Sequence, residues 1–502
     1  MVNENNKFVI VGGGSAGWMT ALFVLSKFPR ANITVIQSSQ IGILGAGEAT
    51  TNHFVDFLKI VNISVTDIIK NAKATIKNGV KFTNWHGDNT YYYNTFEDDF
   101  LDHSLISQLD SNNYPLIDME QIALNLPFSN INFNTIISQK DQVKYIFKSV
   151  SEKDPLNHFK KIGDDALHFD AAFLARYFEK IGLERGIQVI EGIVKGFSTD
   201  EFGNIKTVSI NEQSIDCDFI FDCSGFRKLI IGDFYKIPWK SHKKHLPVDK
   251  AIPFFIDYNK KKIPSCTEAI AMKYGWMWKT PVQDRFGCGY VFDSNYINED
   301  EAKDEVEEYL GYSIKIPKIF NFEPGRFEKI YHNNCLSVGL SGSFIEPLEA
   351  SSIQISLHIL DTWADHLDDH EFVNRSYNLY YELIIGFIYF RYITKRDDTL
   401  FWKNFTNNTE APPSANNFLR FKEEFINFDF FNDSRGGIRT AKTILACGHG
   451  QRLFNTKEAE RIFKELKTEK YDKLKDDYLK KLEYYSDKTT DHYEFIEYIK
   501  NY

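Results

Sequence analysis

The sequence predicts an α/β protein in which a Rossmann-like nucleotide-binding domain carries an inserted β-rich segment and a helical C-terminal region. Three observations predict this fold. A glycine-rich run follows a short apolar stretch at residues 8–11, further apolar stretches that end in glycine turns lie between residues 188 and 342, and helical patterns dominate from residue 353 onward. Short strands that alternate with helices favour a largely parallel sheet.

A βαβ unit is expected at the N-terminus. Residues 8–11 form a short continuous apolar run, which is typical of a buried parallel strand. Residues 18–28 then read as an apolar helix that ends before Pro29, and residues 33–36 read as the second strand. The glycine-rich run lies between this first strand and the helix.

The glycines of this run have the G-x-G-x-x-G spacing of a dinucleotide-binding loop. Gly12 would allow the tight turn, Gly14 would let a pyrophosphate approach the backbone, and Gly17 would permit close packing of helix and strand. An acidic residue normally ends the second strand and binds the ribose, whereas this chain has Gln37, which can still form a hydrogen bond. We expect FAD here, in a domain of the glutathione-reductase or aromatic-hydroxylase type. The expected contacts of the loop are Gly12, Gly13, Gly14, Ser15, Ala16 and Gly17.

The nucleotide-binding domain is expected to be discontinuous. Asp170 is a plausible cap for a helix that runs to about Glu184, and strands are expected at 188–194, at 218–224 before Gly225, and at 336–340. Residues 458–485 are charged and periodic, which predicts a solvated helix or helix pair. The predicted FAD-binding domain comprises 1–84, 160–235 and 330–365, and the substrate-binding and helical part comprises 85–159, 236–329 and 366–502, all in a single compact unit.

Composition excludes several classes of protein. The 502 residues carry a net charge of −10, which argues against a nucleic-acid partner. The six cysteines are scattered without a CxxC pair, so neither a zinc site nor a redox dithiol is expected, and no metal is predicted. No signal peptide and no apolar run of the ~20 residues that a membrane span needs are apparent. We therefore expect a cytoplasmic protein with reduced thiols and no membrane partner.

Several further motifs accompany the glycine loop. They are Gly45-Ala46-Gly47-Glu48-Ala49-Thr50, Lys77 within residues 74–82, Trp276-x-Trp278-x-x-Pro281, Glu346-Pro347-Leu348-Glu349, Arg396-Asp397-Asp398-Thr399 and Phe401-Trp402. Taken together, residues 7–455 resemble the tryptophan-halogenase family of flavin enzymes, with Thr280 in place of that family's isoleucine. A single lysine is normally a solvated surface charge, as we expect for Lys73 and Lys81, and two tryptophans at strand spacing are normally core. The motif set favours a functional role instead.

The resemblance implies a chemistry. Reduced FAD, oxygen and a halide would give hypohalous acid, which reaches Lys77 through an internal tunnel; Lys77 then hydrogen-bonds it or forms a haloamine. Glu349 would orient the electrophile and accept the proton of the arene, whereas Glu346 would be structural. Since no second glycine-rich loop for NAD(P)H is apparent, a separate flavin reductase would supply the reduced FAD. The other FAD contacts that the resemblance implies are Gly47, Glu48, Ala49, Ile193, Gly225, Leu340 and Ile353, with Gln37 at the ribose.

The resemblance also implies a halide site and an aromatic wall. The family binds halide through backbone amides that correspond to Ser351 and Ser352, although Ala350 replaces a serine there and Ser352 a glycine. Trp276 and Trp278, with Pro281, would keep the substrate away from the flavin. The sequence leaves open whether the halide is chloride, bromide or iodide.

The substrate positions depart from the enzymes that act on free tryptophan. Asn94 stands where those enzymes have a histidine beside the indole, Phe96 retains an aromatic ring, and residues 430–437 lack their Glu, Phe and Trp pattern. We therefore expect a small electron-rich arene, such as a substituted indole or a phenol, rather than free tryptophan. The oligomeric state stays open, a homo-oligomer included.

Two other functions fit the same fold. A flavin-dependent aromatic monooxygenase would hold its substrate close to the flavin and would not need Lys77. A non-catalytic module that kept the nucleotide fold, as a flavin-binding carrier or an interaction protein, would need neither Lys77 nor Glu349 and would show no turnover. Replacing Lys77 by alanine distinguishes the first alternative, because hydroxylation would survive this change and halogenation would not.

Overall fold

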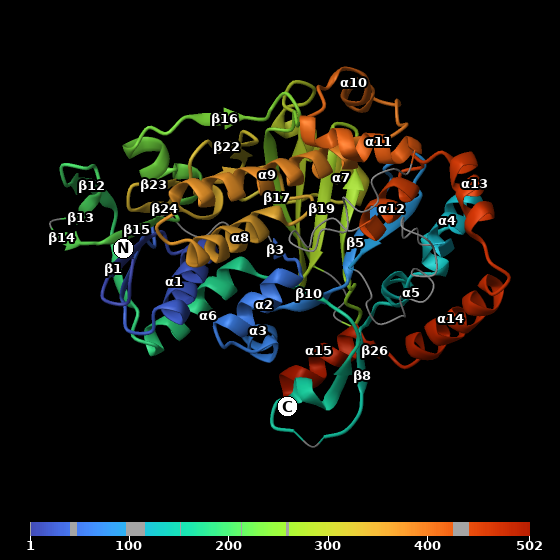
Figure 1. Cartoon of the computed structure of the whole chain (residues 1–502), viewed down its shortest axis with the longest axis horizontal. Coiled ribbons are helices and arrows are strands. Elements are labelled where there is room, and N and C mark those ends of the chain that lie inside the picture. The colour runs from blue at the N-terminus through green and yellow to red at the C-terminus, as the bar shows by residue number, and fades with distance from the viewer. Residues whose placement is uncertain are drawn as a thin grey trace. The chain divides into compact units, whose positions relative to one another are not determined.

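A computed structural model shows how the chain folds (Figure 1). It describes residues 2–40, 48–96, 116–150, 152–211, 213–257, 261–424 and 441–502. The contacts within the chain group into two compact units rather than the single unit that we expected. Unit 1 comprises residues 1–74, 169–249 and 321–382, and unit 2 comprises residues 75–168, 250–320 and 383–502. Each unit has its own main sheet and its own core, which is the physical reason for the division.

The main sheet of unit 1 is the expected Rossmann-like sheet. Its strands, in spatial order, are β11 (Gln188–Glu191), β2 (Asn32–Gln37), β1 (Lys7–Val11), β15 (Phe219–Asp222), β24 (Cys335–Ser337) and β23 (Tyr331–His332). The strands are parallel from β11 to β24, and only β23 is antiparallel to its neighbour. Three distant stretches of sequence thus meet in one sheet, and the predicted α/β class is confirmed.

Helices α1 (Ser15–Lys27), α6 (Ala171–Glu184) and α8 (Ser351–Asp365) pack around the main sheet of unit 1. Helix α1 packs against α6, which begins at the predicted cap: the Asp170 carboxylate accepts hydrogen bonds from the backbone of Ala172 and Phe173. Aromatic side chains fill the core behind the sheet, where Trp363 of α8 lies edge-on to Phe221 with ring centroids 5.1 Å apart. These helices therefore fix β1 and the loop that follows it.

The remaining elements of unit 1 are short. They are α2 (Asn52–Ile60), α3 (Val65–Asn71), β3 (Glu48–Ala49), the sheet of β12 (Val194–Thr199), β13 (Ile205–Ile210) and β14 (Gln213–Asp216), and the sheet of β16 (Trp239–Ser241), β22 (Gly325–Phe327) and β25 (Ser343–Phe344). The predicted strand at 188–194 is thus divided between β11 and β12. Gly192 marks the division, since a side chain there would meet Ile210 at 2.5 Å. The predicted strand at 336–340 ends at Ser337, because Gly339 turns the chain with a φ of +83°.

Unit 2 is built on a largely antiparallel sheet. Its adjacent strands are β17 (Lys250–Asp257), β20 (Arg285–Phe292), β19 (Gly275–Pro281), β18 (Cys266–Ala271), β5 (Gly79–Thr83) and β6 (Tyr91–Thr95). Only the β18–β5 pair is parallel. One face of this sheet carries Met277, Cys288 and Tyr290, which pack in the core against Val306 of α7 (Glu299–Leu310). The inserted β-rich segment that the sequence predicts is therefore present.

Short strands and helices make up the rest of unit 2. The strands are β4 (Thr75–Lys77), β7 (Gln142–Val143), β8 (Tyr145–Phe147), β9 (Phe159–Lys161) and β26 (Thr490–Asp491). Three elements span the borders with unit 1 along the chain: β10 (Ala166–Phe169), β21 (Phe320–Asn321) and α9 (His370–Tyr392). The helices are α4 (Leu116–Ala123), α5 (Phe133–Gln139), α10 (Leu400–Asn408), α11 (Asn416–Glu424), α12 (Ala441–Gly450), α13 (Thr456–Leu466), α14 (Tyr471–Ser486) and α15 (His492–Asn501).

The charged region at 458–485 thus forms a pair of helices, α13 and α14, which is one of the two arrangements that its pattern predicted. All six cysteines are buried and unbridged. Among the described residues, no helix is both long and apolar enough to cross a membrane.

Candidate functional site

The glycine loop of unit 1 leaves room on one side and none on the other. Gly12 has a φ of +127°, and a side chain there would lie 2.1 Å from the Cys223 carbonyl oxygen. A side chain at Gly17 would lie 1.8 Å from the carbonyl oxygen of Gly12, so close packing of helix and strand requires this glycine. Gly14 faces open space, since a Cβ atom at this position would meet nothing within 4 Å, and the first turn of α1 contains no acidic residue. An anionic diphosphate therefore fits at this helix N-terminus.

The end of β2 carries an acidic group that the local sequence does not reveal. The Gln37 amide nitrogen donates to a Glu179 carboxylate oxygen at 2.6 Å, and the Gln37 amide oxygen accepts from the Trp18 indole at 3.3 Å. Glu179 belongs to α6, 142 residues further along the chain, so no spacing near β2 could have identified it. Whether Gln37 contacts a ribose stays a prediction.

A buried carboxylate holds the turn that follows β15. Asp222 accepts hydrogen bonds from the Ser224 hydroxyl and from the backbone amides of Ile230 and Ile231, at 2.6–3.0 Å. Burial raises the pKa of Asp222, and these hydrogen bonds oppose that shift. Its backbone carbonyl also accepts from the Ser341 hydroxyl. Asp222 therefore joins two turns that carry predicted cofactor residues, a role that the sequence analysis missed.

The other predicted cofactor residues lie at element ends in unit 1. Gly225, with a φ of +66°, starts a 3₁₀ turn, and Leu340 lies in the 3₁₀ turn at residues 339–341. Ile193 links β11 to β12, and Ile353 lies in the first turn of α8. Glu48 and Ala49 form β3, whereas Gly47 lies outside the described residues. Burial of its carboxyl, followed by the negative charge of Asp170, raises the pKa of Glu48 to about 7.

The N-terminus of α8 has the features of an anion site. Ala350 adopts the left-handed conformation, with a φ of +52°, and α8 begins at the next residue. No acidic residue lies in the first turn, so the backbone amides of Ser351 and Ser352 present the positive end of a fifteen-residue helix. The Ser351 hydroxyl is buried and forms no hydrogen bond within the described part of the chain. Just before this turn, Glu346 is fully buried and Glu349 is partly exposed.

Lys77 lies at the end of β4 in unit 2, with only 3% of its surface exposed. Three contacts fix its strand. The Thr75 hydroxyl donates to the carbonyl of Pro281 at 2.7 Å, the Ile76 amide donates to the His492 ring at 2.9 Å, and the next amide along, that of Asn78, donates to the Ser265 carbonyl at 2.7 Å. Lys77 and the strand that carries Trp276 and Trp278 are therefore positioned together, through Pro281.

Buried groups that stay neutral at physiological pH surround this strand. Burial lowers the pKa of His168 well below its usual value, and it lowers the pKa of His492 to about 3. Burial likewise raises the pKa of the Cys266 thiol to about 12. The positive charge of Lys77 contributes to the shift of His168, so these two side chains are close in space. Neither histidine could be predicted from the sequence, because neither belongs to a motif.

The Phe96 ring lies beside Lys77. The Lys77 ammonium nitrogen is 5.6 Å from the centroid of this ring, within cation–π range. The Phe96 backbone amide donates to the Asn78 carbonyl at 2.9 Å, and the Asn134 side-chain amide donates to the Phe96 carbonyl, so the backbone that carries the ring is held at both groups. By contrast, Lys81 forms an ion pair with Glu268 at 3.2 Å, and both side chains are partly exposed. Lys77 therefore differs from the nearby Lys81 in being buried.

One face of the unit 2 sheet carries three of the predicted substrate residues, whereas the alternation of β19 places Pro281 on the opposite face. Trp276 and Trp278 alternate with Met277, and their rings lie 6.2 Å apart. Trp278 pairs with Gly289, where any side chain would meet the indole at 2.0 Å. The strand register places Asn94 of β6 on the same face as the two tryptophans. Asn94 is 8% exposed, and its amide oxygen has no hydrogen-bond partner in the described residues.

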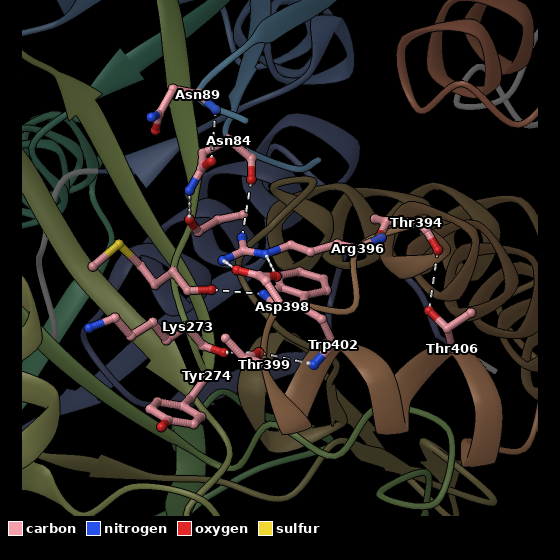
Figure 2. Close-up of polar contacts among 12 residues, drawn as sticks. Asn84, Asn89, Lys273, Tyr274, Thr394, Arg396, Asp398, Thr399, Trp402 and Thr406 are labelled. Carbon is pink, nitrogen blue, oxygen red and sulfur yellow. Dashed lines mark hydrogen bonds and ion pairs between the residues drawn. The ribbon is translucent and has the colours of Figure 1, made fainter. Parts of the chain in front are cut away.

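A polar clamp holds the turn that leads into Trp276 (Figure 2). Arg396 donates to both carboxylate oxygens of Asp398, at 2.5 and 3.0 Å, and to the Asn84 carbonyl at 3.1 Å. The Thr399 hydroxyl donates to the Lys273 carbonyl, and the Trp402 indole donates to the neighbouring Met272 carbonyl at 2.8 Å. The Arg396–Trp402 motif therefore supports the β18–β19 turn. In the part of the chain that is described, no cluster of His, Cys, Asp or Glu is arranged to hold a metal.

Comparison with known proteins agrees with these features. Residues 7–475 match the family described as tryptophan halogenase. The chain is 30% identical to RebH, a tryptophan 7-halogenase of Lentzea aerocolonigenes, over 80% of this chain and 79% of RebH. It is 29% identical to KtzR, a 7-chloro-L-tryptophan 6-halogenase of Kutzneria sp. (strain 744), over 74% of this chain and 75% of KtzR. The solved structure of Tar14, a tryptophan C-6 flavin-dependent halogenase (chlorinase) from taromycin biosynthesis, has a TM-score of 0.86 and 26% identity over 99% of this chain and all of its own.

Proposed function

The chain belongs to the tryptophan halogenase family, and on this premise we propose which of its residues halogenate an aromatic substrate. It is a flavin-dependent halogenase. The observation that carries the proposal is the burial of Lys77 beside the Phe96 ring, since a lysine without a function in the protein interior is rare. The other roles follow from the chemistry that such a lysine needs around it.

The residues of unit 1 fit FAD. The open side of Gly14 would admit the pyrophosphate, the N-terminus of α1 would stabilise its charge, and Gly225 and Leu340 lie in turns that Asp222 organises. Reduced flavin, when bound, supplies the electrons with which oxygen oxidises a halide to hypohalous acid. We infer that a separate flavin reductase delivers it, because only one dinucleotide loop is apparent in the sequence.

Halide would bind at the start of α8. The amides of Ser351 and Ser352 point out of a helix N-terminus, and the buried Ser351 hydroxyl offers one more donor. Ala350 holds the left-handed turn that aims these amides. This arrangement suits a monatomic anion, which needs donors but no acceptor.

Lys77 would deliver the halogen. Its nitrogen would either hydrogen-bond hypohalous acid or attack its halogen, so that an N–X bond forms while the O–X bond breaks and water leaves. The arene would then take the halogen, and its ring proton would pass to a carboxylate. We assign this base to Glu349, which is partly exposed, and not to Glu346, which is fully buried.

The substrate would be an electron-rich arene with a hydrogen-bond donor. The buried amide oxygen of Asn94 is an acceptor that lies on the same sheet face as Trp276 and Trp278, and an indole N–H or a phenol O–H would satisfy it. The named relatives are tryptophan halogenases, yet residues 430–437 lack the pattern of those enzymes. We therefore propose a substituted indole or a phenol instead of free tryptophan.

Mass spectrometry of reaction mixtures tests this function. The mixture would contain the protein, FAD, NADH, a flavin reductase, one halide and a panel of indoles and phenols with tryptophan included. We expect a halide-dependent mass shift that Lys77→Ala or Glu349→Gln reduces by about 10²-fold or more, whereas the matched variant Lys81→Ala retains it. Oxygen incorporation that survives Lys77→Ala would instead indicate a monooxygenase. Turnover of tryptophan in preference to the other arenes would contradict the proposed substrate class.

A further inference from the structure

A second lysine lies in the interior of unit 2 close to Lys77. Lys144 connects β7 to β8 and has no exposed surface. Its ammonium nitrogen is 5.9 Å from the centroid of the Phe96 ring, the same ring that Lys77 approaches to 5.6 Å. Because both distances end at one centroid, the two nitrogens are at most about 11.5 Å apart. Two fully buried lysines on one aromatic ring are not explained by packing, since lysine is among the residues that are least often buried.

Both lysines act on the same neighbours. The positive charges of Lys77 and Lys144 each favour the thiolate of Cys266, although burial keeps this thiol neutral. His168 and His492 are neutral too, so neither histidine adds a positive charge beside Lys77. Asp165 is a buried carboxylate that directly precedes β10, the strand that pairs with β4. It forms an ion pair with Lys161 and accepts a hydrogen bond from the Tyr145 hydroxyl at 2.7 Å. Asp141, before β7, pairs with Lys262 at 2.9 Å.

We propose that Lys144 is a positioning residue for Lys77: its buried positive charge favours the neutral amine form of Lys77, which is the form that can bond to the halogen. The inference rests on the proposed function, because it presupposes that Lys77 is the lysine that receives the halogen. It specifies that function further, since it selects the haloamine over the hydrogen-bonded alternative.

Chemistry requires such a device. An ammonium group has no lone pair, and a lysine with an ordinary pKa of about 10.4 is neutral in fewer than about one molecule in 10³ at pH 7. Burial and a neighbouring positive charge both favour the neutral amine, as in other enzymes with a nucleophilic lysine. Both nitrogens lie within 6 Å of the centroid of the Phe96 ring, which keeps the two side chains near each other. The lone pair of the neutral amine then forms the N–X bond as the O–X bond of HO–X breaks, and the departing hydroxide takes a proton from the nitrogen to become water.

The test is the pH dependence of halogenation in Lys144→Met, which removes the charge and nearly keeps the length of the side chain. Without the charge of Lys144, Lys77 binds its proton more tightly, so the acidic limb of the profile should move to higher pH. At a separation near 11 Å and an effective dielectric constant of about 20, we expect a shift of about one pH unit. Below the limb the rate should fall by up to about tenfold, and at high pH it should recover. Lys144→Arg keeps the charge and should leave the limb in place.

Three outcomes would overturn the inference: an unchanged limb in Lys144→Met, a limb that moves to lower pH, or an equal loss of rate at every pH in the folded variant. The last of these would mean that Lys144 only supports the fold. The result for Lys77→Ala distinguishes a failure of the inference about Lys144 from a failure of the proposed function. If Lys77→Ala abolishes halogenation while the limb of Lys144→Met does not move, only the role of Lys144 is wrong.

A second measurement needs neither flavin nor the variant, so it serves if Lys144→Met does not fold. The whole wild-type protein is exposed briefly to hypochlorite at a series of pH values, and peptide mass spectrometry locates the chlorinated lysines. Lys77 should take up chlorine with a midpoint at least one pH unit below that of Lys81, which is a partly exposed lysine on the neighbouring strand β5. Equal midpoints for the two lysines would overturn the inference.

Discussion

Gly14 and Gly17 belong to the same loop, but Gly14 faces open space and Gly17 is tightly packed. Substitution of each glycine should therefore have a different effect. A methyl group at Gly14 would meet nothing within 4 Å, whereas one at Gly17 would lie 1.8 Å from the Gly12 carbonyl oxygen. We predict that Gly14→Ala leaves the stability of the flavin-free protein unchanged but weakens FAD binding, because the methyl group occupies the space of the pyrophosphate. Gly17→Ala should lower the flavin-free stability by about 1–3 kcal/mol.

Thermal unfolding without flavin and fluorescence titration with FAD measure the two effects separately. Gly17→Ala is the control for Gly14→Ala, because it changes the same loop by the same group of atoms. If Gly14→Ala bound FAD as tightly as the wild type, the pyrophosphate would not lie over this glycine.

The buried carboxyl of Glu48 predicts a pH dependence of stability. Burial, and secondly the charge of Asp170, raise the pKa of Glu48 from 4.5 to about 7 in the folded state. The folded state therefore holds this proton more tightly than the unfolded state, so stability should fall as pH rises from 4.5 to 7. Glu48→Gln removes this dependence, and its advantage over the wild type should grow across that window to at most about 3 kcal/mol above pH 7.

Urea unfolding of the flavin-free protein at several pH values measures this difference. A constant difference between the two proteins from pH 4.5 to 8 would mean that Glu48 has an ordinary pKa. Since β3 holds this residue next to a predicted cofactor position, the measurement also reports whether the carboxyl enters FAD binding as the acid or as its anion.

At the scale of elements, the sequence predicted the features that depend on a single short segment. Asp170 caps α6 as predicted, and the glycine loop lies between β1 and α1. Contacts between distant segments were not predictable. Glu179 reaches Gln37 from α6, and nothing in the sequence around Lys77 indicates that His492, near the C-terminus, accepts from the preceding residue of its strand. Such pairs depend on how strands are ordered in the sheet, which is not encoded in any short motif.

The clamp around the β18–β19 turn allows a prediction about one connection between elements. Arg396 is 4% exposed and makes a two-point contact with Asp398 as well as a bond to the Asn84 carbonyl (Figure 2). Lysine cannot reproduce this planar contact. We predict that Arg396→Lys lowers the free energy of unfolding by about 1–3 kcal/mol.

Arg452→Lys is the matched control for this substitution. Arg452 pairs with Asp88 at 2.9 Å, and Asp88 lies in the turn between β5 and β6, as does Asn84, which Arg396 contacts. Half of the Arg452 side chain is exposed, so the control should change the free energy of unfolding by at most about 0.5 kcal/mol. Urea denaturation of both variants gives the comparison. Equal effects would show that the Arg396 contact contributes no more than an ordinary surface ion pair.

At the scale of the whole molecule, the sequence predicted a discontinuous flavin domain but placed its borders imperfectly. The predicted segments 1–84, 160–235 and 330–365 compare with 1–74, 169–249 and 321–382 in unit 1. The borders differ by 9 to 17 residues. At the first border, β4 and β5 follow α3 closely along the chain, and both strands belong to unit 2. Composition does not change at this border, so no sequence signal marks it.

The division into two units predicts where flavin stabilises the chain. The predicted FAD contacts that are described, from the glycine loop to Leu340 and Ile353, all belong to unit 1. A ligand that binds only the folded state at 100 times its dissociation constant adds about 2.7 kcal/mol, which slows exchange through unfolding of that unit by about 100-fold. Hydrogen exchange with and without oxidised FAD should therefore show strong protection of β1, α1 and β15, and little change in β19 and β20 of unit 2. Gly14→Ala should lose the protection of unit 1. Equal protection of both units would mean that they unfold together, as the single compact unit that the sequence first suggested.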